Sequence, residues 1–187
     1  MATPFVIREA VSADVAALAR LQMQHCAHGH AEGIGTAIRL GEHGHPHRVM
    51  VAVADGGIGT DLTSYYSMKS SSVMAVTDGG IAFHCQKFLT VVGYAIIRPH
   101  NRGAQPDPAI GDVGRINEIG ELYVCPSHRR HGVGSALVTR VIDLSRADRC
   151  GYVVVNVWPR NDPALAFFAK QGFIFRAVPA FTHAVRL

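Results

Sequence analysis

The sequence is poor in charged and aromatic residues. Of its 187 residues only 17% are charged and 7% are aromatic, while 48% are hydrophobic. A disordered chain has the opposite balance, with few apolar and many charged residues, so most of this chain should fold. A nucleic-acid-binding surface usually combines a dense basic stripe with aromatic rings, and the sequence has neither. We therefore expect a globular protein with no nucleic-acid partner.

Long hydrophobic runs and paired cysteines are missing as well. The longest nearly apolar stretch, residues 88–97, falls well short of the roughly 18 residues that span a bilayer. The N-terminal residues lack the basic segment and apolar block of a signal peptide. The four cysteines form no C-x-x-C pair, which argues against a zinc ribbon or a thioredoxin-type motif. These absences predict a cytoplasmic protein with reduced thiols and no membrane partner.

The length and the charge distribution indicate the size of the protein and the kind of ligand. A chain of 187 residues favours one domain, so residues 1–187 are predicted to form a single domain. Residues 1–97 carry 6 basic and 7 acidic side chains, whereas residues 98–187 carry 12 basic and 7 acidic ones. Arginine accounts for 15 of the 18 basic residues, and its planar side chain suits phosphate contacts. The C-terminal half is therefore predicted to bind a small anion.

Hydrophobic periodicity predicts alternating strands and helices. Residues 5–11 form a strand before a helix capped by Ser12, and Pro99 should end the strand that begins at residue 88. From residue 118 the predicted order is strand, helix, strand, helix and two final strands. The expected strands are 5–11, 48–55, 73–78, 88–98, 118–124, 152–158, 173–178 and 181–187, and the clear helices follow Ser12, span 134–148 and begin at Asn161 or Asp162.

Histidine is concentrated in one segment of the N-terminal half. Six of the 11 histidines lie between His25 and His47, with the spacings H-x-x-H-x-H and H-x-H-x-H. Such spacing can hold zinc or nickel, but no aspartate or cysteine pattern completes a site. Because histidine-rich loops are often simply exposed, we predict no metal.

The turn after Val124 combines several features of an anion-binding site. Between Cys125 and Ala136 the sequence has basic and polar side chains and two glycines at the start of a predicted helix. Glycines let backbone N–H groups approach an anion closely, and a helix N-terminus favours negative charge. The spacing fits neither a Walker loop nor a dinucleotide fingerprint, because Leu137 stands where the third glycine of the latter belongs. The turn therefore predicts a diphosphate site of another kind.

Two segments of the C-terminal half resemble the GNAT superfamily of acyl-CoA N-acyltransferases. Arg129-Arg-His-Gly-Val-Gly134 is similar to the Arg/Gln-x-x-Gly-x-Gly/Ala pyrophosphate loop of that family, and it lies between a strand ELYV and a helix, as that loop does. Downstream, Asn161-x-x-Ala-x-x-x-Phe168 followed by Gly172-Phe173 resembles a second segment of the family. The specific similarity covers about residues 114–176, with a looser fit at 5–22.

The resemblance implies a fold and a binding site for acetyl-CoA. The fold is of the α/β (α+β) class, a GNAT-like mixed, mostly antiparallel twisted sheet of six to seven strands with about four flanking helices. Two of its strands splay apart, and the pantetheine arm of acetyl-CoA runs between them like an added strand. Backbone groups of Tyr123 and Val124 meet the pantetheine, Asn161 contacts its end, and Phe168 packs against the cofactor. The pyrophosphate binds to Arg129, Arg130, His131, Gly132, Val133, Gly134 and Ser135.

Acetyl transfer to an amine needs a group that removes a proton, since alkylamines are mostly protonated at neutral pH. Glu118 stands six residues before Val124, where glutamate-using members of the family place their general base, and we prefer it for this role. Glu121 is nearer the splay and could bind the ammonium group of the acceptor instead. The two glutamates differ in parity, so on a regular strand they point to opposite faces. Either of them could also be a surface partner of an arginine.

One departure from the family pattern concerns the leaving group. Many members carry a tyrosine that protonates the thiolate, whereas this sequence has Phe168 at that position. Tyr123, Cys125 and solvent are the substitutes. Trp158 is expected to pack at the end of a strand or to line the acceptor pocket.

The predicted function is that of an acetyl-CoA-dependent N-acetyltransferase acting on a primary amine of a small molecule, by direct transfer in a ternary complex. Two alternatives stay open: a non-catalytic acyl-CoA-binding sensor, which Phe168 favours, and an acetyltransferase acting on a protein amine. The small amine is the expected partner, and the sequence leaves a homodimer open.

Overall fold

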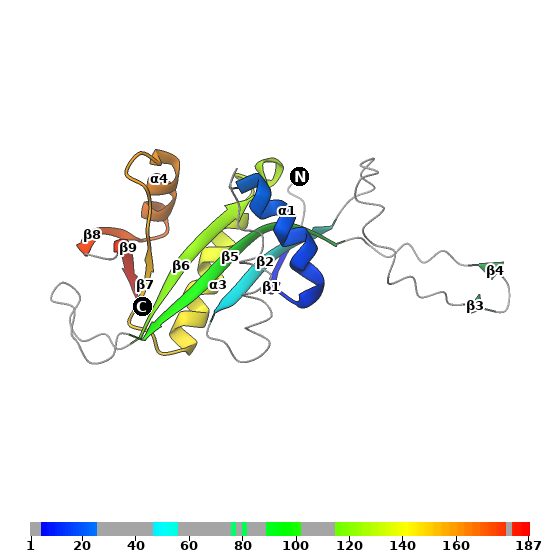
Figure 1. The fold of residues 1–187 in the computed structure, drawn as a ribbon, viewed down its shortest axis with the longest axis horizontal. Coiled ribbons are helices and arrows are strands. Elements are labelled where there is room, and N and C mark those ends of the chain that lie inside the picture. Colours follow the sequence, from blue (N-terminus) through cyan, green and yellow to red (C-terminus); the bar gives the residue numbers. More distant parts are fainter. Residues whose placement is uncertain are drawn as a thin grey trace.

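The structure of the protein is a computed structural model with a mixed sheet at its centre (Figure 1). The sheet has seven strands in the order β1-β2-β5-β6-β7-β9-β8. All neighbouring strands are antiparallel except β6 and β7, which are parallel. The structure describes residues 5–25, 47–55, 76–77, 80–81, 89–101, 115–178 and 181–187.

The elements follow the predicted order closely in the C-terminal half. The strands of the sheet are β1 (Phe5–Glu9), β2 (Arg48–Asp55), β5 (Leu89–Asn101), β6 (Arg115–Val124), β7 (Tyr152–Val155), β8 (Ile174–Val178) and β9 (Phe181–Arg186). A separate pair is formed by β3 (Val76–Thr77) and β4 (Gly80–Ile81), within and just beyond the predicted strand 73–78. The helices are α1 (Val15–His25), α3 (Val133–Ala147) and α4 (Asp162–Lys170), and short 3-10 turns are η1 (Ser12–Asp14) and η3 (Pro126–His128).

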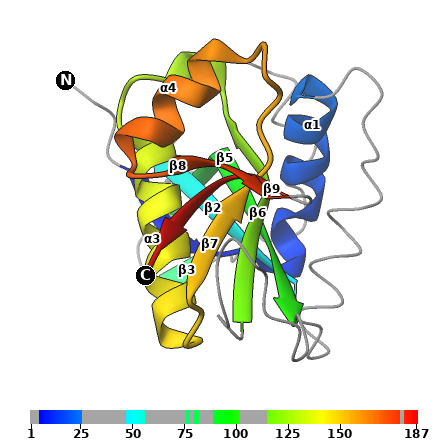
Figure 2. The ribbon, with the colours of Figure 1, turned by 90° about the vertical axis from the view of Figure 1, so that its left-hand side faces the viewer.

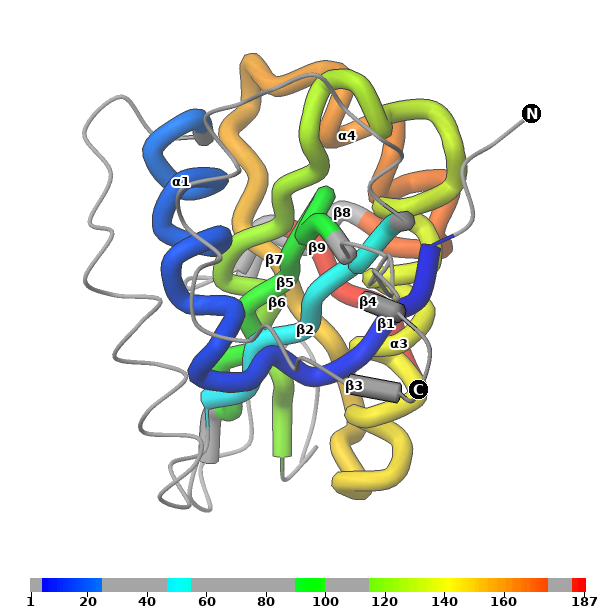
Figure 3. The backbone as a smooth tube through the Cα atoms, turned by 90° about the vertical axis from the view of Figure 1, so that its right-hand side faces the viewer, coloured from blue at the N-terminus to red at the C-terminus, as the bar shows by residue number. Residues whose placement is uncertain are grey.

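Helices cover both faces of the sheet, as Figures 2 and 3 show from opposite sides. We call the face under α1 the α1 face and the face under α3 and α4 the α3 face. The buried side chains of α3 recur three and four residues apart, which gives the helix an apolar stripe against the sheet. None of the helices in the described ranges is long and apolar enough to cross a membrane.

The predicted fold class is confirmed. The sheet is mixed and mostly antiparallel, and its seven strands lie within the predicted six to seven. The described residues contain three α-helices, against about four expected. Residues 26–46, which contain most of the histidine-rich segment, lie outside the described residues.

β5 continues through Pro99, so the prediction that this proline ends the strand 88–98 is wrong. β2 begins at Arg48 opposite Ile97, so the described part of β5 beyond this point pairs with β6 on one side only. A proline is tolerated in a strand where its missing N–H faces an unpaired edge. Pro99 therefore stands opposite Asn117 of β6 without interrupting the ladder.

The start of α1 also differs from the prediction, because the helix begins at Val15 and not directly after Ser12. The preceding 3-10 turn is held by Asp14, whose Oδ2 accepts a hydrogen bond from the N–H of Val11 at 2.9 Å. Arg8 of β1 donates to both oxygens of the same carboxylate, at 2.6 and 2.8 Å. The acidic side chain thus stabilises the turn in place of the predicted serine cap.

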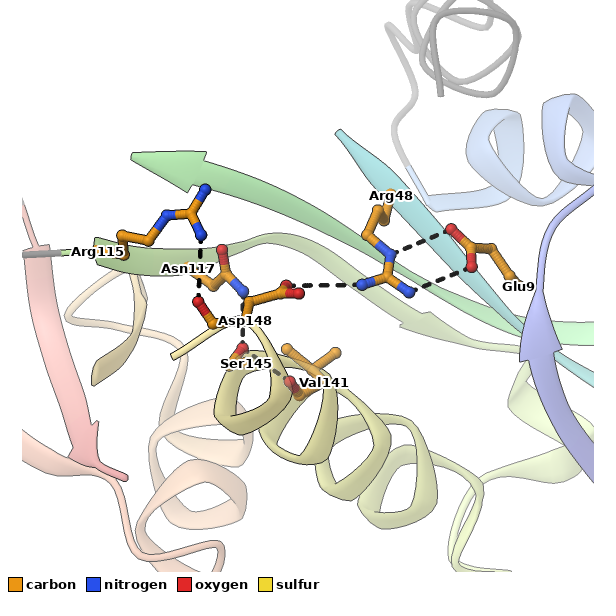
Figure 4. Close-up of polar contacts among 7 residues, drawn as sticks. All are labelled: Glu9, Arg48, Arg115, Asn117, Val141, Ser145 and Asp148. Atoms are coloured by element: carbon orange, nitrogen blue, oxygen red, sulfur yellow. Dashed lines mark hydrogen bonds and ion pairs between the residues drawn. The ribbon is translucent and has the colours of Figure 1, made fainter. Parts of the chain in front are cut away.

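Polar contacts fasten the C-terminal end of α3 to the sheet (Figure 4). Asn117 of β6 donates from Nδ2 to the hydroxyl oxygen of Ser145 at 2.9 Å, and that hydroxyl donates to the helix carbonyl four residues earlier at 2.8 Å. Nearby, Arg48 of β2 pairs with Glu9 of β1 at 3.1 Å and with Asp148 after α3 at 3.6 Å. Asn117 and Ser145 are both buried, so β6 is tied to α3 inside the core.

Candidate active site

β6 and β7 lie side by side at one end and separate at the other. Their parallel pairing ends at Ile119 and Val155. β6 continues to Val124, whereas the chain leaves β7 at Asn156, before the end of the predicted strand 152–158. The second half of β6 therefore borders an opening between the two strands, in agreement with the splay that the family resemblance implies.

Val124 directs its backbone groups into this opening. The N–H of Cys125, the next residue, donates to the carbonyl of Val92 in β5 at 2.8 Å. Successive residues of a strand point their N–H and C=O groups to alternate sides, so those of Val124 point away from β5. The carbonyl of Val124 accepts a hydrogen bond from Nε of Arg129 at 2.9 Å. This placement suits a residue that pairs with an extended ligand in the opening.

Tyr123 is oriented differently from the expectation that its backbone meets the pantetheine. Its carbonyl oxygen faces β5, since it lies 2.8 Å from the position that a Cβ on Gly93 would occupy. Its ring packs on the α1 face, 6.0 Å from the ring of Tyr94, and the guanidinium of Arg129 lies 5.7 Å from its centre. Of the two residues, Val124 is therefore the one whose backbone groups point toward the opening.

The turn between β6 and α3 contains two residues with left-handed backbone conformation. Arg130 and Gly132 have φ angles of 66° and 84°. A Cβ at Gly132 would meet nothing within 4 Å, so the conformation alone favours glycine there. Gly132 precedes the first residue of α3, where backbone N–H groups have no helical partner and the helix dipole favours negative charge. These N–H groups can hold an anion.

The side chains of this turn differ in what they offer to a ligand. Arg130 and His131 are exposed to solvent. Val133 is buried in the core, so only its backbone N–H can meet a ligand. With Arg129, which is also exposed, the predicted pyrophosphate loop therefore combines three exposed side chains with backbone donors.

The first turn of α3 packs closely against α4. A Cβ at Gly134 would lie 3.3 Å from the ring of Phe167, so glycine lets the two helices approach. Ser135 accepts a hydrogen bond at its Oγ from Nε2 of Gln171, at 3.1 Å. This bond ties the start of α3 to the end of α4.

Asn161 and Phe168 have structural roles in and around α4. Oδ1 of Asn161 accepts a hydrogen bond from the N–H of Ala164 at 3.3 Å and caps the helix, which leaves its Nδ2 for another partner. Phe168 is buried and packs edge-to-face against Phe167 and Phe173, at ring distances of 5.1 and 5.2 Å. Phe168 is therefore a core residue, and it has no hydroxyl group that could protonate a thiolate.

A β-bulge at Gly120 turns Glu118 and Glu121 to the same face of the sheet. Two consecutive residues of β5 stand opposite Ile119 and Glu121, so Gly120 is an extra residue on β6. Ile119 packs in the core on the α3 face, whereas Glu121 accepts a hydrogen bond from Gln22 of α1. Glu121 therefore lies on the α1 face.

Glu118 lies on the α1 face as well. Its neighbours Asn117 and Ile119 both point to α3, the first by its hydrogen bond and the second by its core packing. Alternation along the strand then directs Glu118 to the opposite side. The expectation that Glu118 and Glu121 point to opposite faces is thus wrong, because it assumed a strand without a bulge.

Glu121 is held by groups from three elements. Its Oε2 accepts hydrogen bonds from the hydroxyl of Tyr94 in β5 at 3.0 Å and from Nε2 of Gln22 in α1 at 3.4 Å. Its Oε1 lies 3.9 Å from the guanidinium of Arg98. One carboxylate oxygen is therefore fixed by two donors, and the other faces a longer ion pair.

Glu118 is only 8% exposed and lies beside the start of the opening. Asn156, just after β7, donates from Nδ2 to Oε1 of Glu118 at 3.4 Å. Arg98 stands opposite Glu118 in the register of β5 and β6, and a Cβ on Gly120 would lie 2.7 Å from its guanidinium carbon. The guanidinium of Arg98 thus lies across the bulge near Glu121, and its residue stands opposite Glu118 in the register.

Sequence reasoning did not single out Gln22, Tyr94 or Arg98. Gln22 follows Leu18 by four residues, and Leu18 is on the buried stripe of α1, so its helical position could have revealed it as a buried polar side chain. Tyr94 and Arg98 are four residues apart on β5, so their side chains lie on the same face of that strand. Nothing in the sequence shows that this face meets Glu121.

Residues 64–173 match the model of the acetyltransferase (GNAT) family. This stretch is more than half of the chain. The chain belongs to the GNAT family. The family membership that the resemblance of the pyrophosphate loop implied is therefore confirmed.

Solved structures share the fold of this GNAT protein. The PaiA N-acetyltransferase from Thermoplasma acidophilum, in complex with coenzyme A, has a TM-score of 0.63 and 12% identity over 98% of this chain and 99% of its own. The aminoglycoside N-acetyltransferase AAC(6')-Iy, in complex with coenzyme A, has a TM-score of 0.63 and 15% identity over 93% and 90%. NAA60 of Arabidopsis thaliana, in complex with a bisubstrate analogue, has a TM-score of 0.63 and 15% identity over 97% and 94%. At these identities the likeness is one of fold.

Trp158 and the histidine-rich segment are the remaining features that the sequence singled out. Trp158 is 83% exposed, so the prediction that it packs at the end of a strand is wrong. The histidine-rich segment lies outside the described residues except at its ends. Among the described residues, no group of three or more histidine, cysteine, aspartate or glutamate side chains could hold a metal ion.

Proposed function

We propose that this GNAT protein, as one domain spanning residues 1–187, is an acetyl-CoA-dependent N-acetyltransferase for a primary amine of a small molecule. Its membership of the family supports the reaction class and the acyl donor. The observation that supports the site most directly is the position of Glu118 and Glu121, which share one face of β6 beside the opening. A base and an ammonium-binding carboxylate are the two groups that an amine acceptor requires.

The donor binds between β6 and β7 and over the start of α3. Val124 pairs with the pantetheine through its carbonyl oxygen, which points away from β5. Backbone N–H groups from Gly132 to Ser135, with Arg129, Arg130 and His131, hold the pyrophosphate. Asn161 contacts the pantetheine through Nδ2. The coenzyme A in the PaiA and AAC(6')-Iy structures, which share this fold, supports the choice of ligand.

Bound acetyl-CoA supplies the acetyl group as a thioester, and the side chains of β6 supply the acid-base chemistry. Glu121 binds the ammonium form of the acceptor, and Glu118 takes one proton from it, directly or through water. The N–H of Val124 binds the carbonyl oxygen as negative charge develops there. The neutral amine then attacks the thioester carbon: the new C–N bond forms, the C–S bond breaks, and coenzyme A leaves as a thiolate. The amide nitrogen releases its surplus proton to solvent, and the thiolate takes a proton from solvent. Phe168 has no part in that last step.

The experiment that tests this proposal measures the release of free thiol from acetyl-CoA with a panel of amines. The panel contains small primary amines and peptides with free N-termini. Glu118→Gln should lower kcat by about 10²- to 10⁴-fold, because a general base contributes that much. The affinity for coenzyme A should stay unchanged. Asp143→Asn, at an exposed carboxylate of α3, is the matched control and should keep full activity.

Each alternative function has its own result in this assay. Tight binding of coenzyme A with no thiol release on any amine indicates the acyl-CoA sensor. Release with the peptides alone indicates a protein amine as acceptor. Release with small amines that survives Glu118→Gln at full rate contradicts the role of Glu118.

A further inference from the structure

The side chain of Gln22 is buried in a polar cluster on the α1 face, and one end of its amide lacks a partner. We use the name Glu121 cluster for Gln22, Tyr94, Arg98 and Glu121. Gln22 is 4% exposed, and its Nε2 donates to Oε2 of Glu121 at 3.4 Å. Its Oε1 is buried and receives no hydrogen bond from any residue that the structure describes.

A buried carbonyl oxygen without a donor is costly, and few buried polar groups in native proteins lack a partner. The amide cannot be turned to remove the problem, because its other end must face the carboxylate of Glu121 with a donor. The missing partner is therefore an N–H or O–H group that comes from outside the described cluster. An amine bound at Glu121 carries such a group.

The arrangement of Glu121 supports the same conclusion from a second side. The Tyr94 hydroxyl and the Gln22 amide both donate hydrogen bonds to Oε2 of Glu121. Among the residues that the structure describes, Oε1 has only Arg98, at 3.9 Å, which is beyond hydrogen-bond distance, and the side chain of Glu121 is 24% exposed. A rigid carboxylate with one well-held oxygen and one accessible oxygen is preorganised for a cation.

We infer that Gln22 is a specificity-determining residue of the acceptor site: its Nε2 positions Glu121, and its Oε1 accepts a hydrogen bond from the acceptor amine. This inference rests on the proposed function of the site. The acceptor class it implies is a cationic primary amine without a carboxylate beside the amino group. Glu118 and Glu121 give the site two carboxylates, and the cation that lies against Glu121 among the described residues is Arg98, so a carboxylate on the acceptor beside its amino group would be repelled.

The test is calorimetric binding of amines to the full chain saturated with coenzyme A, in which no transfer can occur. The probes are butylamine, glycinamide and glycine. Gln22→Met replaces the amide with an apolar chain of similar length, and Gln24→Met is the control at an exposed position of the same helix. We expect Gln22→Met to weaken butylamine and glycinamide by about 10- to 100-fold, as lost hydrogen bonds to charged groups do. Gln24→Met should match the wild type.

A merely structural role for Gln22 predicts a different pattern. In that case coenzyme A affinity and thermal stability would fall together with amine affinity, whereas our inference leaves the coenzyme A Kd within about twofold. Tyr94→Phe removes one of the two donors to Oε2 and should weaken the same amines several-fold. In turnover, both variants should raise the KM of the amine more than they lower kcat.

The outcomes separate this inference from the proposed function. If Gln22→Met weakens the binding of the amines, the inference is supported. This holds even if the wild type releases no thiol, because that result would refute only the transferase function. Unchanged amine affinity in Gln22→Met, or no binding of any probe, overturns the inference. Glycine that binds as tightly as glycinamide overturns the stated acceptor class.

Discussion

Removing the hydroxyl of Ser145 should destabilise the protein by leaving a buried amide donor without a partner. Asn117 donates to that hydroxyl at 2.9 Å, and both side chains are at most 3% exposed. An unsatisfied buried donor costs about 1–3 kcal/mol. For a chain of this length each kcal/mol corresponds to about 2–4 °C in Tm, so Ser145→Ala should lower Tm by about 2–12 °C.

A double-mutant cycle isolates the contact from the loss of one hydroxyl group. Asn117→Leu with Ser145→Ala removes both polar partners and replaces the asparagine by an apolar side chain with the same branching, so no buried donor is left without its acceptor. The double variant should therefore be more stable than the sum of the two single effects predicts. Thr139→Ala, at an exposed position of α3, is the control and should change stability by less than about 0.5 kcal/mol.

Urea unfolding followed by far-UV circular dichroism is the suitable assay. The single tryptophan, Trp158, is 83% exposed in the folded protein, so its fluorescence is a weak reporter of unfolding. The midpoint should fall with the m-value unchanged. Ser145→Ala within about 0.5 kcal/mol of the wild type, or strictly additive single effects, would refute the reasoning.

Three further predictions concern the anion site and the pH dependence of stability. Gly134→Glu places a carboxylate at the N-terminus of α3 and a Cβ 3.3 Å from Phe167. Calorimetry should then show a loss of coenzyme A affinity of about tenfold or more. A loss below about threefold would contradict the anion site. Burial alone would raise the pKa of Asp14, but the hydrogen bond from Arg8, with that from the backbone, holds the pKa below its usual value. Stability from this pair is present at neutral pH and lost as the pH falls below about 4, so Asp14→Asn should flatten the acid limb of a Tm–pH curve. Burial lowers the pKa of His183, so near pH 6.5 the unfolded chain binds more protons than the folded protein. Stability should therefore fall as the pH drops through about 6.5. If His183→Gln gives a Tm–pH curve with the same slope in this range, the prediction is wrong.

The C-terminal half could be predicted from the sequence because its signals are local. The turn after Val124 follows from its glycines, and α3 from apolar side chains at helical spacing. The cap of α4 follows from Asn161 ahead of a proline. Each of these signals lies within a few residues of the structure it specifies, so no knowledge of neighbouring strands was needed.

The acceptor side of the site depends on contacts between distant segments, and these have no local signal. Glu121 meets Gln22 across 99 positions and Tyr94 across 27. Parity assigns Tyr94 to a face of β5, but the register between β5 and β6 decides which residue of β6 it meets. The sequence therefore identified Glu121 as a candidate and missed the two side chains that hold it.

The bulge at Gly120 is the one error of the sequence analysis that changes the chemistry, and its signal was present. Ile119, Leu122 and Val124 all contribute to the core on the α3 face, but a regular strand cannot place residues 119 and 122 on the same face. An extra residue between them resolves the conflict, and glycine inside a strand is a common mark of a bulge. The same extra residue brings Glu118 and Glu121 together on the α1 face. Without it, one of the two carboxylates would be buried among the apolar side chains under α3, where an unpaired charge is strongly unfavourable. The extra residue in the apolar pattern of β6 is thus the physical condition for having the proposed base and the proposed ammonium-binding group in one site.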